Sequence, residues 1–277
     1  MLKEKLKQIP FIVGLVRKYR KYYGVNWIKT LLVNIKTQEF NVARKLPIYG
    51  KLNIRLLSGK IIIINAPIRS GMIRIGRNAE YFSASKGSAL LSVSGTLIFE
   101  GSALFSVDCT IKVSGTCILG DMVMFGSSVK LVCFEKIDIG KGSRIGLESH
   151  IFNTNFHFLR NVSSGKISKN SDEVLIGNFC WIGNRTTITK GSHLPNYSIT
   201  GSNSLLNRDY TKEETLDYPV FAGVPAKLVG SGLARVFGNS LEFDIHNYFK
   251  KNPSEDTFQG VVGFYDESQS INLFPNG

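Results

Sequence analysis

His157 is the residue of this chain whose type and setting best suit proton transfer. It follows Asn-Thr-Asn-Phe at residues 153–156 and stands where the surrounding pattern requires an aliphatic residue. An imidazole titrates near neutral pH and can take the proton of a hydroxyl group as its oxygen attacks. The simpler interpretation is that His157 only marks the end of a regular element. The remaining histidines are weaker candidates: His150, His193 and His246.

Arg208 and Lys227 are residues that could bind a phosphate group. Both side chains are positively charged and donate hydrogen bonds, which phosphate oxygens accept. Lys227 ends a Gly-Val-Pro-Ala-Lys sequence at residues 223–227. A single basic residue is most often part of the solvated surface, but this pair together with the short motif indicates an anion site.

A repeat of six residues must position these groups. Between residues 176 and 206 an aliphatic residue recurs at every sixth place with one exception, and a small residue follows four places later. The residues at the leading place are Ile176, Ile182, Ile188, Leu194, Thr200 and Leu206, and the small ones are Cys180, Thr186, Ser192, Ser198 and Ser204. This period is neither that of a helix nor the alternation of a flat strand.

The repeat predicts an all-β solenoid. A chain that makes a short strand, turns a corner and repeats stacks coil on coil at about 4.8 Å, with like side chains in columns inside a three-sided prism. Cys117 and Cys180 fall at repeat places. We therefore expect them to be buried packing residues, not metal or redox groups.

The pattern is less regular before residue 139. Strands are expected at residues 52–57, 61–64, 72–75, 90–93 and 97–99. A six-residue spacing runs from Ile111 to Val129 and then slips by four residues, which predicts degenerate coils and a small corner insertion at residues 134–136. Residues 158–175 are polar and without pattern, so we expect a loop thrown out of the coil, and loops of this length are usually functional.

Positive charge is concentrated at the start of the chain. The net charge is +13, and residues 1–60 hold 14 Lys or Arg against two Glu, which leaves the other 217 residues nearly neutral. A solenoid that binds nucleic acid would carry its charge along the coils, so we expect no nucleic-acid partner. Apolar residues at helical spacing in residues 1–40 predict two helices. These helices could cap the first coil, contact an anionic membrane through a basic amphipathic face, or do both.

Residues 71–230 resemble the hexapeptide-repeat acyltransferases, most specifically over residues 139–229. The resemblance rests on the repeat, on Gly-Val-Pro-Ala-Lys at residues 223–227, and on Trp-Ile-Gly at residues 181–183. It implies a left-handed parallel β-helix with an N-terminal helical extension. The chain would then divide into a basic helical extension at residues 1–47, the acyltransferase domain at residues 48–230, and a C-terminal tail of irregular order at residues 231–277.

The resemblance also implies the catalytic and acceptor-binding residues. Sugar acetyltransferases of this kind often end an Asp-Thr-Asp-Phe-His sequence with the general base, so His157 would be the base and Asn155 would orient it. Because amides replace the acidic residues here, the missing charge would come from Glu148, Asp172 or Glu173. A backbone amide just after Trp181, at Gly183 or Asn184, would donate to the oxyanion. Asn153 and Trp181 would line the acceptor site, although Trp181 equally fits an exposed or interface aromatic.

Coenzyme A would lie along the last coils and the short motif. The residues that the resemblance assigns to it are Gly183, Ser202, Asn203, Ser204, Arg208, Gly223, Pro225, Ala226 and Lys227. An insertion at residues 211–217 departs from the pattern of the family and lies just before the motif.

The implied function is acetyl-CoA-dependent O-acetylation of a sugar hydroxyl in a bacterial surface polysaccharide or its precursor. Acetyl-CoA is a co-substrate, no metal is required, and the enzyme would be a homotrimer. The sequence has neither a signal-peptide pattern nor a long apolar run, so we expect a cytoplasmic protein, with peripheral contact at the inner membrane face through residues 1–40.

Three alternatives remain open at the level of sequence. The same base and coenzyme groove would serve an N-acyltransferase acting on an amino sugar. The Asn residues that replace acidic ones favour a non-catalytic β-helix scaffold. A β-helical carbonic anhydrase would bind zinc through His150, His157 and His193, but it would leave residues 223–227 unexplained.

Overall fold

The computed structural model describes residues 24–77, 87–213, 217–236 and 239–258. Residues 24–234 form one compact unit, and residues from 235 onward belong to another. In the second unit the helix α5 (Asn239–Lys251) is preceded by Arg235, whose guanidinium lies 3.1 Å from Glu242. The C-terminal tail was expected to be irregular, and this helix corrects that expectation. The first of the two expected N-terminal helices falls within residues 1–23, outside the described residues.

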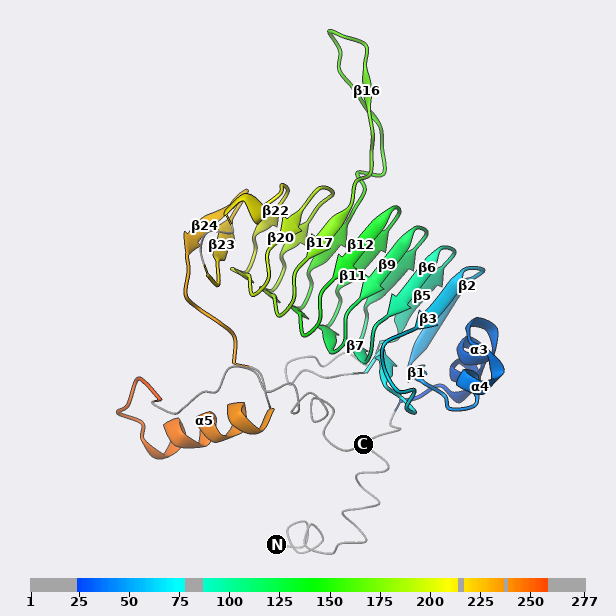
Figure 1. Cartoon of the computed structure of the whole chain (residues 1–277), viewed down its shortest axis with the longest axis horizontal. Helices are drawn as coiled ribbons and strands as arrows, with labels where there is room; N and C mark the ends of the chain where they lie inside the picture. Colours follow the sequence, from blue (N-terminus) through cyan, green and yellow to red (C-terminus); the bar gives the residue numbers. More distant parts are fainter. Residues whose placement is uncertain (1–23, 78–86, 214–216, 237–238, 259–277) are drawn as a thin grey trace, which may run out of the picture. The chain divides into compact units, whose positions relative to one another are not determined.

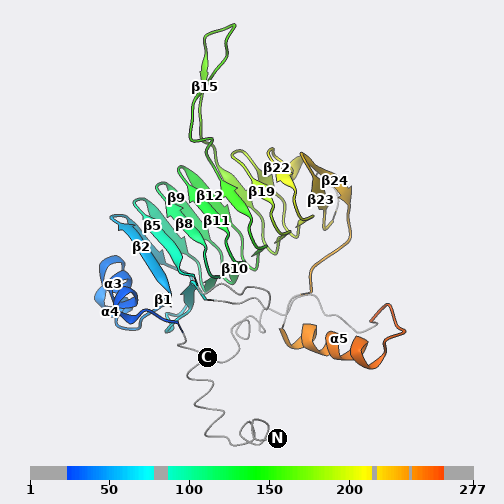
Figure 2. The ribbon, with the colours of Figure 1, turned by 180° about the vertical axis from the view of Figure 1, so that it is seen from behind.

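Three sheets of stacked strands form the walls of a prism (Figures 1 and 2). Sheet A contains β1 (Ile48–Gly50), β4 (Ile73–Ile75), β7 (Ala103–Phe105), β10 (Val123–Phe125), β13 (Arg144–Ile145), β18 (Trp181–Ile182), β21 (Ile199–Thr200), β23 (Val220–Gly223) and β24 (Ala226–Gly230). Sheet B contains β2 (Leu52–Leu57), β5 (Ala89–Val93), β8 (Thr110–Val113), β11 (Lys130–Cys133), β14 (His150–Phe152), β19 (Thr187–Ile188) and β22 (Leu205–Leu206). Sheet C contains β3 (Lys60–Ile63), β6 (Thr96–Phe99), β9 (Thr116–Leu119), β12 (Lys136–Ile139), β17 (Val174–Ile176) and β20 (His193–Leu194).

The prism is a parallel β-helix, as the repeat predicted. Except for β24, which runs antiparallel to β23, each strand of these sheets pairs in parallel with the strands of the neighbouring coils. All of the leading residues from Ile176 to Leu206 are buried, and so are the four cysteines. Burial raises the pKa of Cys180 to about 12, which fits a packing residue.

Small residues at the corners carry hydrogen bonds from coil to coil. The hydroxyl of Ser149 donates to the carbonyl of Gly183 and accepts from the N–H of Thr186 in the next coil. Ser143 makes the corresponding pair of bonds with Gly177 and Cys180. These hydroxyls are buried but satisfied, which explains why Ser or Thr recurs at this place of the repeat.

The degenerate coils expected are found at the start of the prism, where Ile48 pairs with Ile73 and Leu52 with Ala89. The coils from residue 89 to residue 139 are regular. Thr110 pairs with Lys130 and Thr116 with Lys136, a period of 20 residues, whereas Ile176 pairs with Leu194 at a period of 18. The two additional residues stand at the corner between sheets B and C in each of four coils, as Ser58-Gly59, Ser94-Gly95, Ser114-Gly115 and Phe134-Glu135. The apparent slip after Val129 is therefore one member of a stacked column of widened corners.

An arm leaves the prism at this same corner. Between β14 and β17 the chain forms a hairpin whose strands β15 (Leu159–Arg160) and β16 (Ile167–Ser168) pair antiparallel, and it projects away from the coils in Figure 1. At its base the N–H of Asn155 donates to the carbonyl of Asn170 at 2.8 Å. The irregular loop expected at residues 158–175 is thus a hairpin arm, and Val174 already lies buried in the coil.

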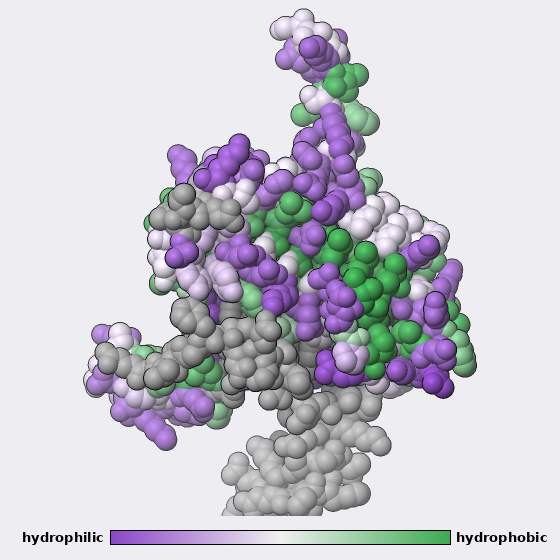
Figure 3. Space-filling model, viewed as in Figure 1, coloured by the Kyte–Doolittle hydropathy of each residue, from purple (hydrophilic) through white to green (hydrophobic). Residues whose placement is uncertain are grey.

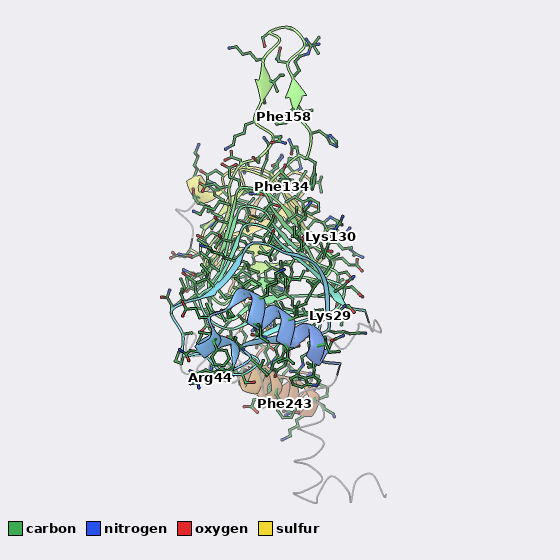
Figure 4. All side chains as sticks on the ribbon, turned by 90° about the vertical axis from the view of Figure 1, so that its right-hand side faces the viewer. Lys29, Arg44, Lys130, Phe134, Phe158 and Phe243 are labelled. Atoms are coloured by element: carbon green, nitrogen blue, oxygen red, sulfur yellow. The ribbon has the colours of Figure 1, made fainter. Side chains whose placement is uncertain are left out.

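Two short helices cap the first coil. α3 (Trp27–Thr37) and α4 (Phe40–Ala43) lie across the end of the prism that faces the viewer in Figure 4. The amide of Asn34 accepts from the N–H of Ile48 and donates to its carbonyl, and Gln38 donates to the carbonyl of Ile61 at 2.7 Å. These bonds satisfy backbone groups that the edge strands would otherwise leave open, so the cap interpretation is confirmed for these helices. None of the described helices is long and apolar enough to cross a bilayer.

The widened corners make a stability prediction. A Cβ added at Gly115 would lie 2.1 Å from the carbonyl oxygen of Glu135 in the next coil. We expect Gly115→Ala to lower the free energy of unfolding by about 1–3 kcal/mol in a urea titration, because backbone on both sides must shift. Gly230→Ala is the control, since nothing lies within 4 Å of its added Cβ. Equal stability of the two variants would contradict the close stacking of these corners.

Candidate active site

The edge between sheets B and C carries the groups expected to do chemistry. We call it the B–C edge and define it as residues 153–157 and 170–173 at the base of the arm, residues 189–191, and residues 207–208. Ile151 pairs with Ile188, and Ile188 pairs with Leu206, so these segments follow one another in successive coils. With strands about 4.8 Å apart, the base of the arm and residues 207–208 lie about 10 Å apart along the prism.

A cavity of about 640 Å³ opens at the far end of this edge. Its lining residues are Asn207, Arg208, Pro225, Ala226, Lys227 and Leu228. The structure therefore brings Arg208 and Lys227 to one cavity together with two further residues of the short motif. The sequence analysis missed Asn207 and Leu228, although their positions next to Arg208 and Lys227 in the chain were a usable signal.

The hairpin of β23 and β24 holds the short motif over the last coil. Ala222 pairs with Lys227 and Gly223 with Ala226, and the Val224–Pro225 peptide bond between them is cis. Tyr210 is buried beneath this hairpin and donates its hydroxyl to the carbonyl of Ala226 at 3.4 Å. The guanidinium of Arg208 lies 4.6 Å from the centre of the Tyr210 ring. This cation–π contact holds the guanidinium beside the short motif.

His157 is exposed at the base of the arm. Its N–H donates to the carbonyl of Asn155 at 2.7 Å, and Phe156 between them has a positive φ, so the chain turns sharply just before the imidazole. The side chain of Asn155 is exposed as well. His157 therefore shares the B–C edge with the cavity at Arg208.

Asn153 does not have the acceptor-binding position that we expected. Its side chain is fully buried; it accepts from the N–H of Phe134 at 2.7 Å and donates to the carbonyl of Lys136 at 3.2 Å. Both ends of the amide are used to close the preceding coil at its widened corner. Asn153 is a structural residue that anchors the arm, and it presents no free group to a substrate.

The three acidic residues expected to support His157 lie in different surroundings. Glu148 lies on the opposite side of sheet B. Asp172 accepts the N–H of Glu173. Glu173 lies 3.6 Å from both the ammonium group of Lys136 and Nε2 of His193.

His193 sits between two carboxylates, a cluster that sequence reasoning missed. Its Nδ1 lies 4.0 Å from Asp209, opposite the contact of Nε2 with Glu173. Hydrogen bonds from Thr211 are the main cause of the lowered pKa of Asp209, so this carboxylate stays charged. The residues belong to neighbouring coils of sheet C, and only the stacking register brings them together.

The other expected site residues are distributed over two further places of the same chain. Trp181 begins β18 on sheet A and is 43% exposed. Gly183, Asn184, Ser202 and Asn203 lie at the corner between sheets A and B, which we call the A–B edge. None of these residues lines the cavity at Arg208.

Two residues expected to bind coenzyme A, Gly183 and Ser204, have their polar groups occupied by hydrogen bonds within the chain. The N–H of Gly183 donates to Thr200, and Gly183 is buried. Ser204 is buried, donates its hydroxyl to the carbonyl of Gly201 at 2.8 Å, and accepts from the N–H of Gly223. The coenzyme contacts expected of Gly183 and Ser204 are corrected to structural roles, and the Ser204 bond holds the start of the short motif in place.

The six-residue repeat and the three-sided parallel coil resemble those of the hexapeptide-repeat acyltransferases. The chain is 25% identical over 159 residues to the polysialic acid O-acetyltransferase of Neisseria meningitidis, a match that covers 57% of this chain and 66% of the relative. No protein-family model matches the sequence.

Two solved structures also align with the chain. The polysialic-acid-specific acetyltransferase NeuO aligns over 73% of this chain and 99% of its own, with a TM-score of 0.44 and 16% identity. The polysialic acid O-acetyltransferase OatWY aligns over 72% of this chain and 98% of its own, with a TM-score of 0.39 and 20% identity.

The role of Asn153 gives a testable prediction. We expect Asn153→Ala to lower the free energy of unfolding by about 1–3 kcal/mol, because the Phe134 N–H and the Lys136 carbonyl lose their partner. Asn155→Ala, at an exposed position on the same turn, should change it by less than about 0.5 kcal/mol. Urea unfolding followed by circular dichroism measures both. An Asn153→Ala protein of wild-type stability would contradict the anchoring role.

Proposed function

We propose that this protein is an acetyl-CoA-dependent O-acetyltransferase that acts on a sugar hydroxyl of a bacterial surface polysaccharide or its precursor. The observation that carries the proposal is the B–C edge, which holds an exposed imidazole and, about 10 Å along the prism, a cavity lined by Arg208 and Lys227. The similarity to a polysialic acid O-acetyltransferase supports the same chemistry.

His157 is the proposed general base. It takes the proton of the acceptor hydroxyl as the hydroxyl oxygen bonds to the thioester carbonyl carbon. The carbon–sulfur bond then breaks, the acetyl group stays on the sugar oxygen, and the proton passes from the imidazole to the departing thiolate. The neutral imidazole is restored, so no covalent enzyme intermediate is needed.

Arg208 and Lys227 are the proposed phosphate ligands for coenzyme A. Arg208 offers a planar set of donors and Lys227 a point charge, and both line the cavity. Pro225 and Ala226 between them leave an apolar wall for the pantetheine arm. The pantetheine chain would then run along the B–C edge toward His157, and its thioester would lie near the imidazole.

A homotrimer is proposed because residues expected in one site lie on different faces of one chain. Trp181 projects from sheet A, whereas His157 stands on the B–C edge. Sheet C also carries an outward column of Ile62, Ile98 and Ile118, which lie in register. Figure 3 shows hydrophobic side chains gathered over the strands of this sheet. Packing this apolar column against a second copy would remove it from water and bring Trp181 of one copy toward His157 of another.

The catalytic proposal is tested by His157→Ala. We expect turnover of acetyl-CoA with an acidic polysaccharide acceptor to fall by about 100-fold or more, because proton transfer contributes that order of rate. Coenzyme A binding, measured by titration calorimetry, should remain within about threefold of wild type, whereas Arg208→Gln with Lys227→Gln should weaken it by about tenfold or more. A His157→Ala enzyme with wild-type turnover contradicts the base assignment.

Subunit mixing tests whether the site lies between copies. His157→Ala and Trp181→Ala proteins, each of low activity, should regain part of the wild-type rate when unfolded and refolded together, because some interfaces then join two intact surfaces. No recovery, with mixed oligomers demonstrated by mass, would place both residues in separate functions. Coenzyme A binding without any turnover in the wild type would favour the non-catalytic scaffold.

We also propose that the N-terminal part contacts an anionic membrane, through the outward face of α3. This helix packs on the prism with Thr30, Val33 and Asn34, which is a largely polar face. Its apolar residues point outward instead: Ile28 is 82% exposed, Leu31 46%, Leu32 48% and Ile35 69%. They form one stripe at helical spacing, an arrangement opposite to that of a helix stabilised only by the core.

Charge favours a lipid surface as the occupant of this stripe. Residues 24–47 carry Lys29, Lys36, Arg44 and Lys45 against Glu39, and residues 1–23 add seven basic residues against one acidic residue. An apolar stripe bordered by cations suits the interface of a bilayer that contains anionic lipids. This would bring the enzyme to lipid-linked precursors at the inner membrane face.

Vesicle binding of the whole chain tests the membrane proposal. Wild-type protein should sediment with phosphatidylglycerol vesicles and not with phosphatidylcholine vesicles, and salt should weaken the binding. Ile28→Asn with Ile35→Asn should lower the partition coefficient by about tenfold or more. Leu233→Asn, at a residue that is 62% exposed outside α3, is the control and should have no effect. Unchanged vesicle binding of the α3 variant, or a changed oligomeric state in its place, would overturn the assignment.

A further inference from the structure

A second open groove lies on the flank formed by sheet B. It has a volume of about 420 Å³ and is lined by Ser128, Lys130, Glu148, His150, Arg185 and Thr187. Figure 4 looks along the prism and shows Lys130 on this flank, well below Phe134 at the B–C edge and Phe158 on the arm. The catalytic proposal above makes no use of this groove.

The groove is built to receive negative charge. Within the described part of the chain, neither Lys130 nor Arg185 takes part in an ion pair. Arg185 is held in place by Asn203, whose side-chain oxygen accepts from its Nε at 2.9 Å, and the two ends of the guanidinium remain available. Lys130 and His150 are register partners on adjacent strands, so both point outward from sheet B side by side.

His150 adds a group that an anion would stabilise. Burial and the neighbouring charge of Lys130 lower the pKa of His150, so at neutral pH it is mainly uncharged. A carboxylate bound between Lys130 and His150 would offset the repulsion by Lys130 and raise the pKa of His150. Glu148 is the one acid among the lining residues, which leaves a surplus of positive charge in the groove.

A row of aromatic rings leads from this groove to the proposed base. The imidazole of His150 stacks on Phe152, with ring centres 5.3 Å apart and planes at 15°. Phe152 meets Phe156 edge to face at 5.8 Å, and Phe156 precedes His157 in the chain. Phe156 in turn meets Phe134 at 5.8 Å, and Phe156 is 48% exposed. Exposed rings of this kind offer flat apolar surfaces on which the C–H faces of sugar rings pack.

We propose that sheet B carries an extended acceptor site for an acidic glycan chain. Lys130 and Arg185 bind carboxylates of sugars distant from the reacting one, and Phe152 and Phe156 carry the intervening sugars to the hydroxyl at His157. The proposal rests on the acetyltransferase function proposed above and narrows its acceptor to a polyanionic polymer at least several sugars long. The charged end and the reacting end are separated by two rings, a distance that a single sugar does not span.

A nucleotide-linked sugar also carries negative charge beside a sugar ring, so it is the alternative acceptor. The position of the cations favours the polymer. A nucleotide diphosphate concentrates its charge at one point and would need a cation next to the reacting sugar. The two cations that line the groove, Lys130 and Arg185, lie at the far end of the aromatic row. A polymer with one carboxylate per sugar presents charge at that distance.

The test compares Lys130→Gln with Arg185→Gln in one protein against Lys60→Gln, an exposed lysine of β3 on sheet C. Neither set includes a residue assigned to catalysis or to coenzyme binding. With a sialic acid oligomer as acceptor, we expect the double variant to raise KM by about tenfold and to leave kcat within about twofold. The salt dependence of KM should weaken as well, because fewer charges are paired. Lys60→Gln should behave as wild type.

Two further measurements distinguish the possible outcomes. Phe152→Ala should raise KM for the oligomer and leave KM for a single sialic acid unchanged. Direct titration of the oligomer and of a nucleotide-linked sialic acid into enzyme without acetyl-CoA measures the groove alone, and the oligomer should bind more tightly. Wild-type turnover with an unchanged KM in the double variant overturns the acceptor site and leaves the acetyltransferase proposal intact. Tighter binding of the nucleotide sugar also overturns it, whereas a wild type that turns over no glycan contradicts the underlying function.

Discussion

Hydrogen bonding of each coil to the next along three sheets is the constraint on which the rest of this structure depends. Because the strands inside each sheet pair in parallel with the coils on both sides, their backbone hydrogen bonds form only if each corner is passed at the same height in successive coils. The corner hydroxyls of Ser143 and Ser149 bind across this same spacing. The sheets themselves therefore tolerate little variation, and function has to be built at the corners.

The B–C edge is where the chain uses that freedom. It is widened by two residues in four successive coils, and in the next coil it opens into the arm. Asn153 closes the break by replacing, with its amide, the backbone partners that Phe134 and Lys136 would otherwise lack. As a result the arm departs without disturbing the coil, and His157 stands on the same edge as Arg208 two coils later.

At the two ends of the prism the sheets are open and must be covered. At the start, α3 covers them with polar groups, because the groups left over there are backbone N–H and C=O, and this choice turns the apolar stripe of the helix outward. At the other end the hairpin of β23 and β24 covers the last coil and brings Pro225 to Lys227 over Tyr210. Closure and function are thus combined at each end, with a proposed membrane contact at one and a proposed coenzyme site at the other.

The sequence alone determined the solenoid, since a six-residue period with aliphatic leaders fits only a short repeated coil, and every leader from Ile176 to Leu206 is buried as that period requires. It also determined that Arg208 and the short motif belong together, and Arg208 shares one cavity with Pro225, Ala226 and Lys227. It did not determine the 20-residue coils, because the widened corners look like a slip in the repeat until they are stacked. It did not predict the roles of Asn153, Ser204 and Gly183, whose polar groups are consumed by backbone in neighbouring coils. The tertiary structure alone decided which residues of different coils meet, and so brought His193 between Glu173 and Asp209 and Phe156 against Phe134. The physical reason is that contacts between coils join residues about 18 or 20 positions apart, so a pattern read along one coil contains no information about its neighbours.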